Sequence, residues 1–266
     1  MIHLLKLEWL KLRSFQTFKI SVILYIVLLP LLFMAVQAMF LNNSQAASTL
    51  SHLFEYPNLW DTYAYWASWL TFFVLVYLSV LSISSEFTNK TLRQNLITGI
   101  ERGQYLMGKG LIMIMLSLGA TFYLFLITML FCFINGGSGN MFSGIEILPR
   151  FFVQNLGYMS LAFMLAVLLR RSGLVMILFF AYILIVERII RYLIFLQLIE
   201  NLEAGSYFPA SVLWDVVPFF MVNSAAGLDQ QITSIMLDPW VAVGVAAAYI
   251  ALFWVITVRS FMRKDL

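Results

Sequence analysis

Six stretches of the chain are apolar and long enough to be read as membrane spans, and shorter polar segments separate them. A helix needs about 20 predominantly apolar residues to cross the ~30 Å hydrocarbon core of a bilayer. The predicted spans are residues 20–41, 63–84, 110–134, 151–169, 173–186 and 240–258. The fifth is the shortest, because Glu187, Arg188 and Arg191 follow it directly. The pattern therefore predicts an all-α membrane protein with six transmembrane helices.

Residues 1–19, ahead of the first span, alternate apolar and basic positions with helical spacing. The apolar positions are Ile2, Leu5, Trp9 and Leu12, and the basic ones are Lys6, Lys11, Arg13 and Lys19. Basic side chains on such a helix can reach lipid phosphates, and tryptophan favours the membrane interface. We expect an N-terminal interfacial helix here. The alternative is a plain cytoplasmic extension of the first span.

Residues 85–109, between spans two and three, carry charges of both signs. Leu92, Leu96 and Ile100 recur every fourth residue within this segment, which is typical of a short helix with one apolar stripe. A membrane protein with such an element on its cytoplasmic side usually presents it to a soluble partner. The alternative is a solvated loop whose leucines rest on the membrane surface.

Residues 196–239, before the last span, are long for a connection. Their middle part, residues 207–222, is strongly apolar, but Pro209, Asp215 and Pro218 interrupt it. This part is too short and too broken to span, so we expect a re-entrant or outer hairpin. A seventh, irregular span is the alternative, and it would move the basic C-terminus to the outer side.

Composition excludes a soluble catalytic domain. Hydrophobic residues make up 62% of the 266 residues and charged residues only 11%, against about 45–50% and about 25% in soluble domains. The spans consume most of the chain, so residues 1–266 are interpreted as a single transmembrane domain. The run from Gly103 to Gly110 resembles a phosphate-binding loop but ends in glycine where that motif needs Ser or Thr. We expect no enzyme activity, metal site or bound cofactor in this chain.

Basic residues predict the orientation. With six spans both termini share one side, and of the 16 Lys and Arg residues all but Arg150, Arg188 and Arg191 would lie on that side. The positive-inside rule makes it cytoplasmic. Arg170 and Arg171 then form a tight cytoplasmic turn between spans four and five.

The segment 85–109 also carries a family resemblance. An acidic residue, a Lys-Thr pair, two leucines, an arginine and a lysine follow one another as Glu86, Lys90–Thr91, Leu92, Leu96, Arg102 and Lys109. This order resembles the cytoplasmic loop of type-2 ABC exporter permeases, except that Gly99–Ile100 stands where the family usually has Thr-Pro. The N-terminal helix, the six spans, the broken outer segment and the basic end extend the resemblance over essentially the whole chain.

The resemblance implies a permease subunit of the bacterial cytoplasmic membrane. Two such subunits, identical or paralogous, would pair with cytoplasmic ABC ATPase subunits, and the ATPase rather than this chain would bind ATP and Mg²⁺. Residues 85–109 would contain the coupling helix that docks on the ATPase; no nucleic-acid partner is implied. The residues implied in ATPase coupling are Glu86, Lys90, Thr91, Leu92, Arg93, Leu96 and Arg102.

Two other function classes fit the same hydropathy. A secondary transporter should show inverted repeats and polar groups near the midplane, and apart from span five the spans lack such groups. A non-transporting scaffold or assembly factor is the other alternative.

The charges after span five allow two interpretations. Glu187 and Arg191 are one helical turn apart and can pair along the helix. The arginines then either snorkel to outer headgroups, or Arg188 or Arg191 meets an anionic part of the cargo or an acid of a second subunit.

Overall fold

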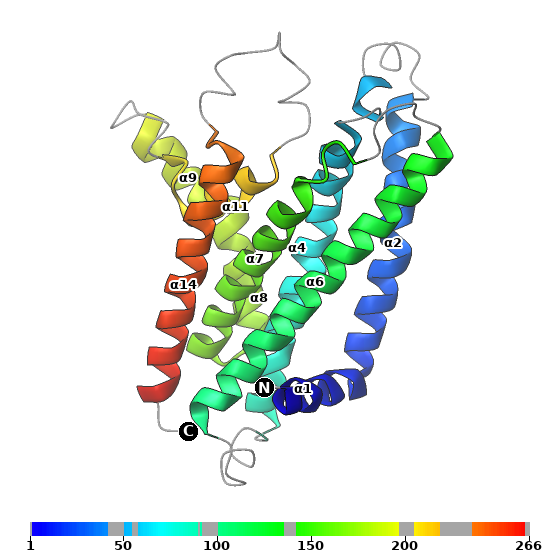
Figure 1. Ribbon diagram of the computed structural model, residues 1–266. Helices are drawn as coiled ribbons and strands as arrows, with labels where there is room; N and C mark the ends of the chain where they lie inside the picture. The colour runs from blue at the N-terminus through cyan, green and yellow to red at the C-terminus, as the bar shows by residue number, and fades with distance from the viewer. Residues whose placement is uncertain are drawn as a thin grey trace.

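The computed structural model describes residues 2–41, 51–54, 58–89, 91, 101–135, 142–196, 205–218 and 236–263. Every element within these ranges is helical (Figure 1). The elements are α1 (Ile2–Ser14), α2 (Gln16–Leu41), the short η1 (Ser51–Phe54), α4 (Asn58–Thr88), α6 (Arg102–Asn135), α7 (Ile147–Leu169), α8 (Ser172–Ala181), η2 (Tyr182–Val186), α9 (Glu187–Ile190), η3 (Arg191–Leu196), α11 (Pro209–Val216) and α14 (Pro239–Arg263). The six predicted spans are confirmed as helices long and apolar enough to cross a membrane.

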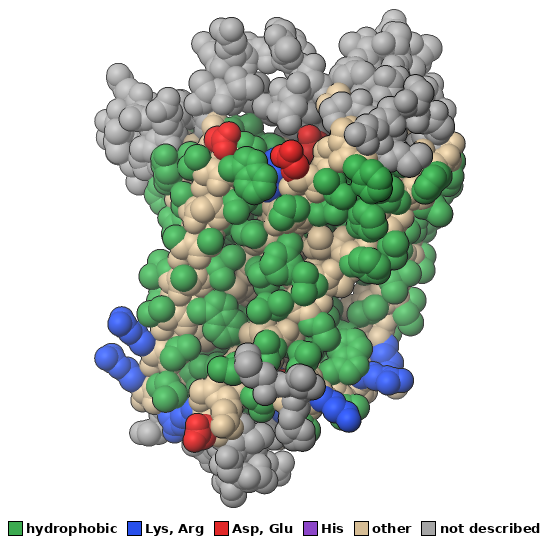
Figure 2. Space-filling model, viewed as in Figure 1, with side chains coloured by type: hydrophobic (Ala, Val, Ile, Leu, Met, Phe, Trp, Pro, Cys, Tyr) green, Lys and Arg blue, Asp and Glu red, His purple; other side chains and the backbone are tan. Residues whose placement is uncertain are grey.

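The bundle is built around α4 and α7. Within its most apolar window, α4 is 72% buried and α7 is 61% buried, whereas the other four candidate spans are at most 28% buried. Ser79 on α4 donates a hydrogen bond to the carbonyl oxygen of Met159 on α7 at 2.9 Å. The outer helices therefore cover the central pair and turn apolar side chains outward, which gives the broad hydrophobic surface in Figure 2.

Both ends of the chain lie at the same end of the bundle. In Figure 1, α1 begins and α14 ends at the lower end, where α4 also ends and α6 begins. Lys and Arg side chains gather at this lower end in Figure 2. An even number of spans requires this arrangement. Which side of the membrane this end faces stays a prediction from the charge distribution.

The two helices on either side of residues 89–101 extend further into the predicted polar segment than the sequence indicated. The sequence predicts residues 85–109 as a polar connection after the second span, but α4 continues to Thr88. Ser85 and Thr88 donate their hydroxyl hydrogens to the carbonyl oxygens four residues earlier, so these polar side chains are satisfied within the helix. The third span was expected to begin at Gly110, but α6 begins at Arg102. Gly103–Gly110 thus lies inside a helix, not in a phosphate-binding loop.

The N-terminal segment divides differently from the prediction of one helix over residues 1–19. α1 ends at Ser14, and α2 begins at Gln16, so Lys19 belongs to the first span. In Figure 1, α1 lies across the end of the bundle. Leu12 is buried, and Leu5 and Trp9 pack against the core, so part of the predicted apolar face contacts protein. Placement of α1 at a membrane interface stays a prediction.

Spans four and five are joined by the predicted two-residue turn. α7 ends at Leu169 and α8 begins at Ser172. Arg170 adopts a left-handed backbone conformation with φ 57°, and its N–H bonds the Ala166 carbonyl oxygen, which closes the last turn of α7. The tight turn is confirmed.

Span five is one continuous helix with wider turns at its far end. The Glu187 N–H reaches the Tyr182 carbonyl oxygen five residues earlier, which is the π-helical spacing. Such a turn rotates the residues that follow it relative to a regular α-helix. α11, the described part of the predicted outer hairpin, packs against α7 and α14 near this end (Figure 1). The rest of residues 196–239 lies largely outside the described residues, so the re-entrant hairpin stays a prediction.

Candidate functional site

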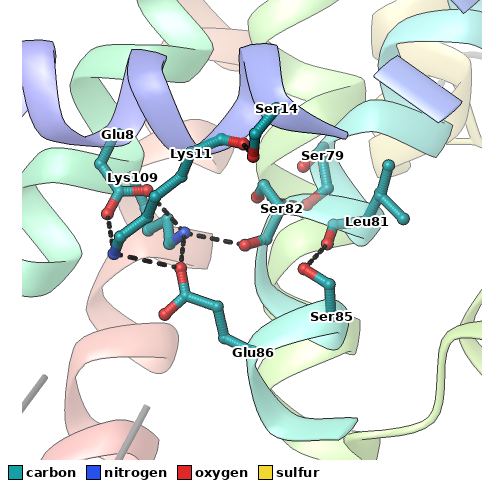
Figure 3. A network of polar contacts seen from close by, with 9 residues as sticks. All are labelled: Glu8, Lys11, Ser14, Ser79, Leu81, Ser82, Ser85, Glu86 and Lys109. Atoms are coloured by element: carbon teal, nitrogen blue, oxygen red, sulfur yellow. Dashed lines mark hydrogen bonds and ion pairs between the residues drawn. The ribbon is translucent and has the colours of Figure 1, made fainter. Parts of the chain in front are cut away.

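A buried ion network joins three helices at the end of the bundle that contains both termini (Figure 3). The ammonium group of Lys109 donates to Glu8 Oε2 at 2.6 Å, to Glu86 Oε1 at 2.6 Å and to the Ser82 carbonyl oxygen at 2.8 Å. An ammonium group has three donors, so all three are used. Lys109 is 1% exposed. The charge is therefore compensated entirely by protein groups.

Lys11 closes the network from the more exposed side. Its Nζ lies 2.9 Å from Glu8 Oε1 and 3.5 Å from Glu86 Oε1. Two carboxylates and two ammonium groups thus balance one another. Burial opposes ionisation of Glu8, but Lys109 and Lys11 outweigh it and hold the pKa of this carboxyl below its ordinary value. Burial likewise opposes the charge on Lys11, and Glu8 and Glu86 overcome it, which raises the Lys11 pKa.

Close packing of α1 on α6 makes these contacts available. A Cβ atom at Gly108 would lie 3.3 Å from the Glu8 Cγ, so the glycine lets α1 approach. Glu8 and Lys11 come from α1, Glu86 from the last turns of α4, and Lys109 from the second turn of α6. The network therefore ties α1 to the two helices that flank residues 89–101.

The predicted ATPase-coupling residues divide into two groups. Lys90, Leu92, Arg93 and Leu96 lie outside the described residues, and Thr91 is half-buried. Glu86 is 6% exposed and holds Lys109 and Lys11. Arg102 donates to the Met262 carbonyl oxygen at 2.9 Å, which joins α6 to the end of α14. Glu86 and Arg102 thus bind neighbouring helices within the domain.

The sequence did not single out Glu8. Its signal was present, because Glu8 is the only acidic residue among the basic and apolar residues of 1–19. An acid three residues before Lys11, on the face that carries Leu5 and Leu12, indicates a buried partner. That partner, Lys109, lies 101 positions away in the chain, and no local spacing reveals it.

A second polar cluster lies at the opposite end of the bundle. The Glu187 carboxylate accepts hydrogen bonds from the Ala210 N–H at 2.8 Å, the Ser211 N–H at 2.6 Å and the Ser211 hydroxyl at 3.0 Å. These backbone groups belong to the first turn of α11, which otherwise leaves its N–H groups without intrahelical partners. A carboxylate at that position is also favoured by the helix dipole. Glu187 therefore fastens span five to α11.

The arginines beside Glu187 have different surroundings. Arg191 donates to Ser206 Oγ at 2.9 Å and to Ser211 Oγ at 3.5 Å, so Ser211 bridges it to Glu187. The sequence predicted a direct pair of Glu187 and Arg191 along the helix; instead, Glu187 accepts two backbone hydrogen bonds from α11. The Arg188 guanidinium stacks 5.9 Å from the centre of the Trp214 ring.

These side chains line a cavity of about 310 Å³ between span five and α11. Asp215 also lines it, and its carboxylate accepts the Leu237 N–H at 3.1 Å. Burial raises the Asp215 pKa to about 6, although the Leu237 N–H and Arg191 counteract it. The sequence identified the charged residues of span five, but it did not predict that Trp214 and Asp215 of α11 line the same cavity.

The chain matches a known protein family. The model of a family described as ABC-2 family transporter protein matches residues 4–187, more than half of the 266-residue chain. The matched range contains Glu8, Glu86 and Lys109 and ends at Glu187. No curated protein matches the chain closely enough to count as a relative.

Proposed function

The chain belongs to the ABC-2 transporter family, and from this premise we propose that it is the permease subunit of an ATP-driven exporter. A separate cytoplasmic ABC ATPase would dock on residues 85–109, and a second permease subunit would complete the pathway. The chain would sit in the bacterial cytoplasmic membrane with both termini in the cytoplasm. Closure of the ATPase around ATP and Mg²⁺ would then move the spans and release the substrate outward.

The observation that supports this coupling is the position of the ion network. Glu86 lies two residues before the end of α4 at Thr88, and Lys109 lies in the second turn of α6. A movement of the ATPase against residues 89–101 would therefore act directly on α4 and α6. At this end both helices are bonded to α1, because the Lys109 ammonium group contacts Glu86 and Glu8. Breaking a buried pair by removing one partner costs about 3–5 kcal/mol, so the three helices should move together at this end.

The proposed contact with the ATPase uses Leu92 and Leu96, with Lys90 and Arg93 at the rim. Glu86 and Arg102 would support this contact indirectly, because their side chains bind neighbouring helices of the same domain. Thr91, beside them in the same segment, is assigned the same indirect role. The apolar side chains would enter a groove of the ATPase, in the way that an amphipathic helix docks by one face.

Association and coupling can be tested separately. The permease is purified from native membranes, and the bound polypeptides are assayed for ATP hydrolysis. Leu96→Asp should lose the ATPase, because an unpaired carboxylate would be buried in the groove. Lys109→Gln should keep the ATPase but reduce the stimulation of its hydrolysis by the permease. An unaltered amount of ATPase bound to Leu96→Asp would contradict docking through this segment.

A further inference from the structure

The cavity between span five and α11 combines a cation with an apolar wall. Arg188 lines it together with Ile183, Tyr192 and Trp214. We propose that this cavity binds an anionic amphiphile, with its phosphate or carboxylate on Arg188 and its hydrocarbon part along Ile183 and Trp214. This binding site goes beyond the proposed coupling function and does not depend on an ATPase.

Arg188 is the anion-binding group in this proposal because the charged residues next to it, Glu187 and Arg191, already have hydrogen-bond partners. Glu187 is engaged by three hydrogen bonds from α11, and Arg191 is directed toward Ser206 and Ser211. Across the described part of the chain, Arg188 makes no ion pair, and its guanidinium lies over the Trp214 ring. A guanidinium can hold a phosphate or carboxylate by two parallel hydrogen bonds.

The Trp214 ring orients the Arg188 side chain for binding an anion. Stacking on Trp214 holds the guanidinium over an aromatic face and leaves the N–H groups at its edge available. The guanidinium is also weakly hydrated compared with an ammonium group, which lowers the cost of removing water when an anion binds.

Span five offers exposed apolar side chains to the hydrocarbon part of the ligand. Ile185 and Ile189, on the same span as Arg188, are 56% and 51% exposed. Ile185 lies three residues before Arg188, on the side toward the middle of the span, so hydrocarbon that leaves the cavity can lie along span five there. A small inorganic anion would use only Arg188 and leave this surface unused, so the arrangement favours an amphiphile.

Arg150 provides a matched control at the same end of the bundle. Its guanidinium stacks 5.8 Å from the centre of the Trp240 ring, much as Arg188 stacks on Trp214, but it is not part of the cavity lining. Arg150→Gln and Arg188→Gln therefore remove the same charge and the same kind of stack.

The test is native mass spectrometry of the full-length chain released from neutral detergent. Phosphatidylglycerol is the anionic probe, phosphatidylcholine the zwitterionic probe, and inorganic phosphate the anion without hydrocarbon. We expect the first phosphatidylglycerol to bind about tenfold more tightly than phosphatidylcholine, equal to about 1.4 kcal/mol. Arg188→Gln should abolish this preference, Arg188→Lys should retain part of it, and Arg150→Gln should leave it unchanged.

The other outcomes overturn the proposal in distinguishable ways. Equal binding of both lipids to the wild type, or equal loss in both glutamine variants, means that the cavity is not an anion site. Displacement of phosphatidylglycerol by millimolar inorganic phosphate means that the site takes a free anion and the hydrocarbon part of the proposal is wrong. None of these results depends on ATPase binding, so they leave the proposed function unaffected.

Discussion

The Lys109 ammonium group lies 2.6 Å from a carboxylate oxygen of Glu8, although 101 positions separate the two residues in the chain. Glu86 holds the same ammonium group from the opposite side, also at 2.6 Å. The N-terminal helix is thereby fixed to both helices that flank the segment proposed to meet the ATPase. The first prediction concerns the strength of this link.

Lys109→Met should lower the thermal stability of the purified permease markedly. The substitution leaves Glu8 and Glu86 buried with only Lys11 nearby, and loss of one member of a buried pair costs about 3–5 kcal/mol. Lys6→Met, on the exposed face of α1, is the control and should change stability little. The double variant Glu8→Gln/Lys109→Met should lose less than the two single variants together. Additive losses would show that the two residues do not interact.

The second prediction concerns the packing of α11 against α7. A Cβ atom at Gly157 would overlap the Leu213 side chain, so Gly157→Ala should displace α11. The cost should be about 1–3 kcal/mol, as for other overpacked sites. Gly119→Ala is the matched control, because no atom lies within 4 Å of a Cβ there. Thermal unfolding of both variants in detergent checks this, and equal midpoints would contradict the described packing.

The third prediction concerns orientation. In a Cys132→Ser background, an impermeant thiol reagent applied to intact cells should label Phe142→Cys but not Arg171→Cys. Both positions are exposed, and they lie beyond opposite ends of span four. Permeabilised cells should give labelling at both positions, which controls for reactivity. The reverse labelling pattern in intact cells would show that the chain has the opposite orientation in the membrane.

The sequence predicted the six spans well because each apolar stretch must be a helix in the membrane, where its backbone groups have no other partners. It predicted the helix ends less well. A charge usually marks the end of a span, so the sequence predicts that Glu86 and Lys109 belong to a polar connection. Each is the other's partner, so both helices continue through them. Hydrogen bonds such as those between Glu187 and the first turn of α11 join segments that are distant in the chain. The spacing of residue types along the sequence therefore does not predict them.

The fourth prediction is a pH dependence at Asp215. Its pKa is raised from 3.8 to about 6 by burial, so the folded state favours the protonated carboxyl. The resulting stabilisation is fully present below pH 3.8 and is lost as the pH rises through 6. Asp215→Asn should therefore be more stable than the wild type at pH 8 and similar to it at pH 4. Unfolding midpoints across this range measure the difference, and a constant difference would contradict a buried carboxyl. The charged groups lining the same cavity are Glu187, Arg188 and Arg191.

An ATPase should engage this chain through residues 85–109, and site-specific photo-crosslinking measures that contact. A photo-reactive amino acid replaces Leu96, and irradiation is carried out in native membranes. Ile177 on α8, which is 68% exposed, serves as the lipid-facing control position. Position 96, but not position 177, should crosslink to a polypeptide that hydrolyses ATP. Crosslinks from position 96 to lipid alone would contradict it.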